Sequence, residues 1–410
     1  PENSRLRKFF DMFQIIKSVK SEEGKFPDGW RVFGVQTDKS NYNALDENTT
    51  LQKNFKKYLL SGNFTGSGLG VMFFDGEKII SCEPDVGYLH RGMEKMAEKL
   101  SYIQYLPTVD RIDYLAGFFY SELLCRIVEG ALEIELHDKV RAIRVMLLEL
   151  NRISSHLLWI GAFLMDLGAV SPFFYAFRER EMILRYFEKI SGQRMMYNYF
   201  VFGGVRRDIS DLQDVEEILR ILPEKLEDYE KIITENPIFI RRTVGKGFLD
   251  KKTALDYAIT GVNLRAGGVD FDYRNCDNLY KGFDVGTVVL EEGDSFARYK
   301  ARILEIKESI KIVHQAIEYL KTAGGLEQKL INPLTLKLPE GEYYADIEAP
   351  RGIASCFVVS DGEKCPYRLK WRTGSYYSVN LLRKILKGEY LNDAIAIAGS
   401  LDIILPEVDK

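Results

Sequence analysis

The chain has 410 residues, of which 46% are hydrophobic and 28% are charged. These values are typical of globular proteins with two or three domains, or with one large core and insertions. The net charge of −4 excludes the strongly basic balance of a typical nucleic-acid-binding protein, so no nucleic-acid partner is expected.

The N-terminal part of the sequence predicts an arm followed by a hairpin. Residues 1–65 are polar and weakly periodic, which indicates an extension over neighbouring subunits. The next region, 66–95, contains the short apolar runs 71–74 and 79–82, and Asp75-Gly76 begins the turn between them. Two apolar runs around an Asp-Gly turn predict a β-hairpin.

Helical periodicity extends over residues 96–330 and predicts a bundle of long helices. Pro107 and Pro223 are expected to interrupt or kink their helices. The most apolar stretch, 157–177, contains Asp166, Gly168 and Pro172, so it predicts a buried helix and a turn rather than a membrane span. The expected long helices cover 97–129, 139–164, 174–199, 211–230 and 295–320.

Residues 331–410 change in character and predict short strands and helices. The expected strands are 343–347, 356–360 and 367–371, and the expected helices are 379–387 and 392–398. The predicted fold class is therefore α+β. It combines a long-helix bundle with a small mixed or antiparallel sheet to which the N-terminal and C-terminal strands both contribute.

The cysteines and histidines argue against a disulfide framework and a metal site. No two cysteines form a CxxC pair, and their odd number favours a reducing compartment. No histidine lies three to five residues from another, as zinc ligands usually do. The residues are Cys82, Cys125, Cys276, Cys356 and Cys365, and His90, His137, His156 and His314.

Two further motifs have a structural and a functional interpretation. The glycines of 66–70 precede a predicted strand, whereas a phosphate-binding loop follows a strand and opens a helix, so a tight turn is favoured. The segment 83–114 is dense in histidine, arginine, carboxylates and tyrosine. Its composition alone favours structural ion pairs over a site that tunes a redox centre or binds a polar head group.

Six collinear motifs indicate a particular protein family. They are EPDVGYLHRGMEKMAEKLSYIQYLPTVDRIDY at 83–114, LELNRISSHLLW at 148–159, DLGAVSPFFYAFRERE at 166–181, FGGVRRD at 202–208, LRAGGVDFDYR at 264–274 and SLDIILPEVDK at 400–410. Together they resemble the D-subunit family of bacterial NADH-quinone oxidoreductase, respiratory complex I. The resemblance covers residues 78–410.

This family is related to the large subunit of nickel–iron hydrogenases, and the resemblance implies a fold similar to theirs. Those enzymes hold nickel and iron with two CxxC pairs, because such a site requires soft thiolates. Neither pair is present here, so hydrogenase activity is excluded on chemical grounds. The resemblance implies that the former metal cavity now serves an organic acceptor.

The resemblance also implies a place in a larger assembly. It predicts a peripheral-arm subunit of a proton-translocating NADH-quinone oxidoreductase, at the cytoplasmic face of the cell membrane and without a transmembrane helix. The first implied partner is similar to the B subunit of that complex and carries a [4Fe–4S] cluster that reduces a quinone in the cleft between the two chains. Other peripheral-arm subunits and a membrane-arm subunit are further implied partners, and NADH would bind elsewhere.

The resemblance assigns roles to five residues of this sequence. The quinone-binding tyrosine falls on Tyr114, whose phenol is suited to donate a hydrogen bond to a quinone carbonyl. The family's carboxylate at the same site falls on Asp166. Arg111 takes the position of the arginine near the partner's cluster, and His90 and Arg91 are expected close to it.

The chain departs from the family at two histidines. Leu69, followed by Gly70, occupies the quinone-loop position, and Met196 occupies the position of a histidine tied to protonation of the cluster. Histidine is the natural proton source near neutral pH, so proton delivery must differ. Two alternatives stay open: a divergent relative with a non-quinone acceptor, such as a sulfur compound, and a non-catalytic scaffold.

Overall fold

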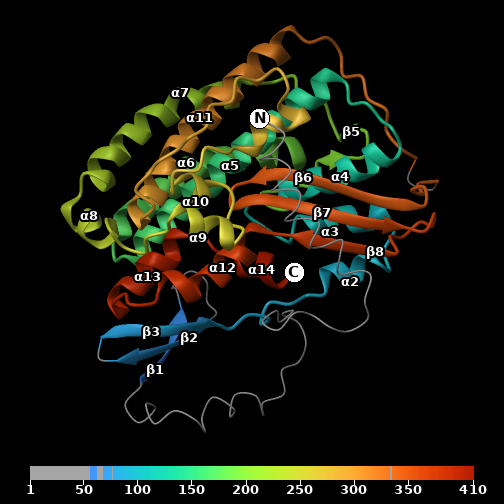
Figure 1. Cartoon of the computed structure of the whole chain (residues 1–410). Helices are drawn as coiled ribbons and strands as arrows, with labels where there is room; N and C mark the ends of the chain where they lie inside the picture. The colour runs from blue at the N-terminus through green and yellow to red at the C-terminus, as the bar shows by residue number, and fades with distance from the viewer. Residues whose placement is uncertain (1–55, 62–67, 76, 333–334) are drawn as a thin grey trace, which may run out of the picture. The chain divides into compact units, whose positions relative to one another are not determined.

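The computed structural model describes residues 56–61, 68–75, 77–332 and 335–410. Everything described belongs to one compact unit, Asn54–Lys410. The predicted arm 1–65 lies outside the described residues except for β1 (Lys56–Ser61). The α+β class is confirmed, because long helices lie beside small antiparallel sheets (Figure 1).

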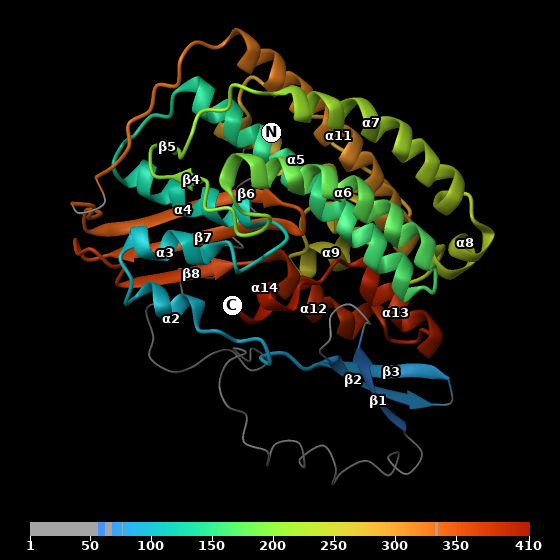
Figure 2. The same cartoon turned by 180° about the vertical axis from the view of Figure 1, so that it is seen from behind.

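The central element of the bundle is α5 (Asp138–Asp166), which is buried along almost its whole length. It packs against α6 (Val170–Ser191) and α11 (Ser295–Thr322), as Figure 2 shows from behind. The His137 side chain caps the start of α5 by accepting a hydrogen bond from Lys139 N. The expected helix at 139–164, and the turn after it, are confirmed.

The helical region near the N-terminus is divided more finely than the sequence predicts. The expected helix 97–129 is three helices, α2 (Met93–Ala97), α3 (Tyr102–Val109) and α4 (Gly117–Ala131). Pro107 lies inside α3, which ends two residues later. Pro223 lies inside α7 (Gln213–Tyr229) without dividing it.

The C-terminal sheet is a meander of β6 (Gly341–Ala349), β7 (Gly352–Ser360) and β8 (Arg368–Arg372). Only two residues separate β6 from β7, and Gly352 adopts a φ of +109° directly after them. A Cβ atom there would lie 2.5 Å from Thr260 Oγ1, so glycine is required. This tight turn fixes the position of Arg351.

The expectation that strands from both ends share one sheet is wrong. Among the described residues, β1, β2 (Gly68–Asp75) and β3 (Lys78–Pro84) form a separate antiparallel sheet. Helix α12 (Gly374–Ile385) packs against both β3 and β7, which leaves no room for direct pairing between the sheets. The N-terminal sheet instead joins the C-terminal segment through a backbone bridge between Lys78 and Tyr390.

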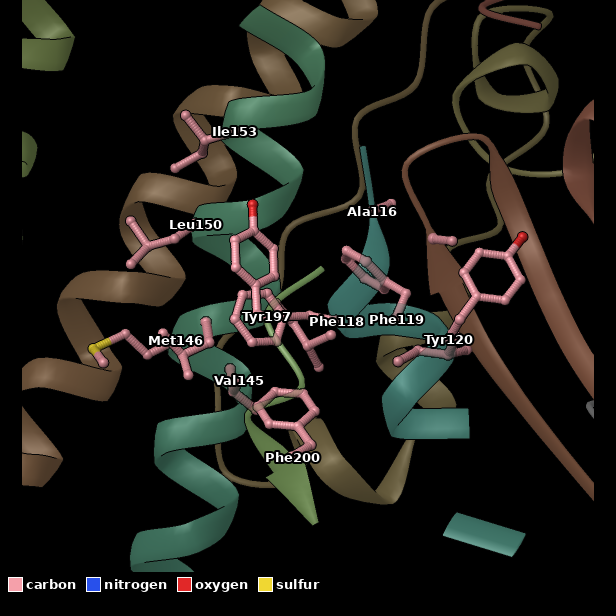
Figure 3. Packing of buried hydrophobic residues seen from close by; sticks show 14 of the residues in the cluster. Ala116, Phe118, Phe119, Tyr120, Val145, Met146, Leu150, Ile153, Tyr197 and Phe200 are labelled. Carbon is pink, nitrogen blue, oxygen red and sulfur yellow. The ribbon is translucent and has the colours of Figure 1, made fainter. Parts of the chain in front are cut away.

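A large apolar core fills the space between the bundle and the C-terminal sheet. Figure 3 shows part of it, where Phe118 of α4 stacks on Tyr197 with ring centroids 4.3 Å apart. Phe200 lies against the Phe118 ring at 5.0 Å. A second core lies between β3, α12 and α13 (Leu391–Ser400) and holds the C-terminal segment in place.

Short elements complete the described fold. They are β4 (Phe200–Val201), β5 (Gly204–Val205), α8 (Pro237–Thr243), α9 (Lys251–Asp256), α10 (Val262–Arg265), α14 (Leu405–Asp409), one π-helical turn (Glu230–Thr234) and two 3-10 turns (Tyr273–Cys276 and Asn278–Tyr280). No helix in the described residues is long and apolar enough to cross a membrane.

Candidate functional site

The turn between α3 and α4 meets the C-terminal segment at a buried ion-pair cluster. Asp113, in that turn, accepts a hydrogen bond from Arg351 Nη1 at 2.9 Å and one from Leu115 N at 3.1 Å. Arg351 also reaches Asp402 Oδ1 at 3.5 Å. The cluster therefore ties together three segments that are far apart in the sequence.

Asp402 is held in an uncommon backbone conformation. Its φ of +57° lies in the left-handed region, which aspartate tolerates better than most residues. Besides Arg351, its carboxylate lies 4.0 Å from Arg302 Nε of α11. Two buried cations therefore hold the Asp402 side chain just before α14.

Tyr114 lies beside this cluster and is half-buried. Its ring packs with that of Phe177 against Leu115, Leu158 and Ile404. Burial raises the pKa of the Tyr114 phenol, and the neighbouring Asp113 carboxylate acts in the same direction. The hydroxyl therefore stays protonated at neutral pH and is available as a hydrogen-bond donor.

Asp113 is a carboxylic acid that titrates near neutrality. Burial raises its pKa to about 7. The Arg351 guanidinium opposes this shift, whereas the Glu407 and Asp402 carboxylates add to it. An acid with such a pKa exchanges protons readily at physiological pH.

The C-terminal helix α14 is anchored beneath the cluster. Glu407 accepts hydrogen bonds from Tyr120 Oη at 2.8 Å, from Gly374 N at 3.1 Å and from Ser375 Oγ. A carboxylate bound by three donors in the protein interior is rigidly placed. It keeps the last residues of the chain against α4 and α12.

His90 and Arg91 contact the C-terminal segment, Arg91 also contacts Arg111, and all three residues are exposed. The main-chain carbonyl of Asp409 lies 2.5 Å from Nδ1 of His90. Arg91 donates to the carbonyls of Arg111 at 2.7 Å and Pro406 at 3.0 Å. The structure thus brings the three predicted residues together, next to the segment that carries Asp402.

Asp166 is the carboxylate that the resemblance assigns to the same site as Tyr114. It is the last residue of α5 and is half-buried. Leu158, which contacts the Tyr114 cluster, is eight residues earlier on the same helix. At 1.5 Å per residue this separation is about 12 Å along the helix axis.

Leu69 and Gly70 lie in β2, not in a loop as the resemblance implied. Gly70 is paired with Leu60 of β1 and with Pro84 of β3. Met196 is half-buried with a φ of +59°, in the segment before Tyr197.

Among the described residues, the donor sets do not suit a metal cofactor. No group of three or more His, Cys, Asp or Glu residues in the described part of the chain is arranged to bind a metal ion. Cys82, Cys125 and Cys356 are buried, and burial raises the pKa of each thiol. They are therefore poor candidates for thiolate ligands.

Sequence reasoning names Tyr114 as a candidate site residue but does not single out Asp113, Arg351 and Asp402. In the sequence, nothing distinguishes Asp113 from Asp110 within the run 110–114. Asp113 differs only in the folded chain, where Arg351 pairs with it and with Asp402. Arg351 stands in the short string EAPRG at 348–352, whose pattern alone does not indicate a site residue.

The chain is similar to known proteins of one family. A family model described as respiratory-chain NADH dehydrogenase, 49 Kd subunit, matches residues 166–410. The NADH-quinone oxidoreductase D subunit of Geobacillus kaustophilus is 45% identical over 343 residues, which is 83% of this chain and 93% of the relative. The D subunit of Bacillus mycoides is 43% identical over the same shares. A second model, GNAT-like C-terminal domain, matches residues 1–72.

A solved structure is also similar. It is a chain of the membrane-bound sulfane sulfur reductase, an archaeal respiratory membrane complex, with a TM-score of 0.83 and 31% identity. The match covers 88% of this chain and 100% of that one. The resemblance drawn from the six motifs is confirmed, and the chain belongs to the family of the 49 kDa subunit of respiratory-chain NADH dehydrogenase.

Proposed function

We propose that this chain and an iron–sulfur partner together form the site where a complex I-type oxidoreductase reduces a quinone. Tyr114 would bind the quinone head group. The observation that carries the proposal is the half-buried Tyr114, whose ring packs in an apolar cluster beside Asp113, a carboxyl group with a pKa of about 7. An apolar pocket with a few polar groups is the usual form of a site for an organic ligand.

The chain's own residues would supply binding and protons, and the partner would supply electrons. The Tyr114 phenol would donate a hydrogen bond to a quinone carbonyl. As negative charge develops on that oxygen, protonated Asp113 would provide a proton, with Arg351 holding the resulting carboxylate. This route would take the place of the family histidines, which are absent at Leu69 and Met196.

The wider setting follows from the family. The chain would sit in the peripheral arm of a proton-translocating complex, against a [4Fe–4S] protein similar to the B subunit, other peripheral-arm subunits and a membrane-arm subunit. Arg111, His90 and Arg91, at the rim of the C-terminal segment, would face the iron–sulfur partner. Asp166, at the end of α5, would be the second catalytic residue of the site, as the resemblance implies.

The first test is Tyr114→Phe in the assembled complex. The expected result is a loss of inhibitor-sensitive quinone reduction of about tenfold or more, because one hydrogen-bond donor to the developing oxyanion is removed. The matched control is Tyr367→Phe, at an exposed tyrosine between β7 and β8. Equal activity in the two variants would sink the assignment of Tyr114.

A second candidate function is the reduction of a sulfur compound. It is favoured by the similarity to the sulfane sulfur reductase chain and by the missing loop histidine at Leu69. Activity with polysulfide but not with quinones would establish it. A complex that reduces neither would indicate that the chain is a scaffold.

A further inference from the structure

Arg180 of α6 differs from the other buried arginines of the described chain. Its side chain is only 8% exposed, yet no hydrogen bond or ion pair within the described residues involves its guanidinium, and Nε is buried without a partner. The contrast with Arg298 is instructive. That arginine has no carboxylate within ion-pair distance among the described residues, but donates to Ser400 Oγ and to the carbonyls of Gly293 and Gly247.

The carboxylates next to Arg180 in the sequence are bound by other groups. Glu179 accepts from Tyr229 Oη at 2.6 Å and from Arg178 at 2.5 Å. Glu181 accepts from Arg194 at 2.6 Å and from Arg185 at 3.3 Å. Arg180 therefore has no committed counter-ion in the described part of the molecule.

Arg180 lies at the Tyr114 site. Its guanidinium carbon is 5.8 Å from the centre of the Phe177 ring, and Phe177 packs in the same apolar cluster as Tyr114. Burial lowers the pKa of Arg180, whereas Tyr197, the Glu181 carboxylate and Tyr114 act in the opposite direction.

A cation that is mostly removed from water and has no partner is unfavourable. Such a group is retained where something outside the chain neutralises it. The position of Arg180, over the Phe177 ring of the apolar cluster that also holds Tyr114, favours the bound acceptor for this role.

We propose that Arg180 is an anion-binding subsite of the acceptor site, where it binds the oxygen or sulfur atom that becomes negatively charged during reduction. The inference rests on the function proposed above. Each electron from the partner's cluster adds one negative charge to the acceptor. A quinone takes up two electrons and two protons to form a quinol, whereas two electrons cleave one bond of a sulfur chain and leave two anionic sulfur atoms.

The role of Arg180 is electrostatic stabilisation of charge that develops during the reaction. A fixed guanidinium beside that charge stabilises it more than it stabilises the neutral oxidised quinone. For quinones the subsite should therefore affect kcat more than KM. For polysulfides, which are anionic before reduction, it should affect both.

The test compares Arg180→Gln and Arg180→Lys with Arg185→Gln in the assembled complex. Arg185 lies on the same helix with a side chain that is 76% exposed. The first readout is kcat and KM with a quinone and with polysulfide. Comparing the two substrates separates negative charge that develops during reduction from negative charge that the substrate already carries. The second is direct binding of a hydroxynaphthoquinone, anionic at neutral pH, and of its neutral methyl ether.

The expected result for Arg180→Gln is a fall in quinone kcat of about tenfold to a hundredfold, with KM changed less than about twofold. Affinity for the anionic probe should fall about tenfold, and affinity for the ether should stay the same. Arg180→Lys should be intermediate, because it keeps the charge and loses the planar fork. Arg185→Gln should match the unmodified complex.

Three outcomes would overturn the inference. One is equal behaviour of Arg180→Gln and Arg185→Gln, in activity and in probe binding. Another is equal loss of affinity for both probes. The third is dissociation of the iron–sulfur partner with normal probe binding, which would mean that Arg180 pairs with a partner carboxylate. If the unmodified complex reduces no acceptor, the proposed function fails separately, and probe binding still tests Arg180.

Discussion

At the scale of single residues, the site depends on how burial changes ordinary side chains. Asp113 and Asp110 lie three residues apart, and both are buried. Asp113 has a guanidinium partner and two further carboxylates nearby, which leave its pKa at about 7. Asp110 accepts instead from Ser121 and from Asn198 N, and burial raises its pKa to about 6.

This difference leads to a prediction for Asp113→Asn. If protonated Asp113 donates during acceptor reduction, activity of the unmodified complex should fall as pH rises through about 7. The variant should lose that limb of the pH–rate profile and be slower by about tenfold or more below pH 7. Asp256→Asn, at an exposed position of α9, is the control. A limb that persists in Asp113→Asn would assign it to another acid.

Sequence alone proposes a role for Tyr114 and proposes none for its neighbours. Tyr114 stands within a motif that can be matched as a string, so the resemblance alone is enough to propose a role for it. Asp113, Arg351 and Arg180 owe their properties to contacts made after folding. Arg180 in particular belongs to an alternating charge pattern, which is typical of a solvated helix face, yet the structure buries it.

At the scale of elements, long periodic segments are predicted well and short or long-range ones are not. The apolar spacing within α5 predicts a buried helix because every turn repeats the same pattern. The helix α14 is five residues long and carries too little periodicity to be predicted. Separation of the two sheets depends on α12 lying between β3 and β7, which no local pattern encodes.

The start of α12 is also where an element controls the site. A Cβ atom at Gly374 would lie 2.1 Å from the Arg351 carbonyl oxygen. We expect Gly374→Ala to push the β6–β7 turn away from α12, to destabilise the fold by about 1–3 kcal/mol, and to weaken the Asp113 ion pair. Thermal unfolding and acceptor reduction measure the two effects.

The control for Gly374→Ala is Gly324→Ala. A Cβ atom at Gly324 would meet nothing within 4 Å. That variant should keep the melting temperature and the activity of the unmodified protein. If Gly374→Ala also keeps the melting temperature and the activity, then the contact between α12 and the Arg351 turn does not determine the geometry of the site.

At the scale of the whole molecule, buried charges connect the bundle to the C-terminal sheet. Glu305 of α11 accepts from His156 Nε2 of α5 at 2.7 Å and from Arg265 of α10. Arg265 also donates to Glu348 at the end of β6, at 2.8 Å. These residues are up to about 190 positions apart in the chain, so sequence patterns show each as an isolated charge.

The pKa shifts in this network predict how stability responds to acid. Burial alone would raise the pKa of Glu305, but Arg265 and the hydrogen bond from His156 hold it well below its usual value. A lowered carboxylate pKa contributes stability above the unfolded-state value near 4.5. That contribution is lost as pH falls further, because the unfolded chain then binds more protons than the folded one.

Glu305→Gln should therefore destabilise the protein strongly at pH 7 and less at low pH. Removing one partner of a buried ion pair costs about 3–5 kcal/mol, because Arg265 would be left with excess buried charge. Denaturant unfolding at pH 7 and pH 4 measures the change against Glu318→Gln, an exposed residue of the same helix. The difference between the two variants should shrink below about pH 4.5, where Glu305 in the unfolded chain becomes protonated. A difference that stays constant over this range would show that packing, not charge, gives Glu305 its importance.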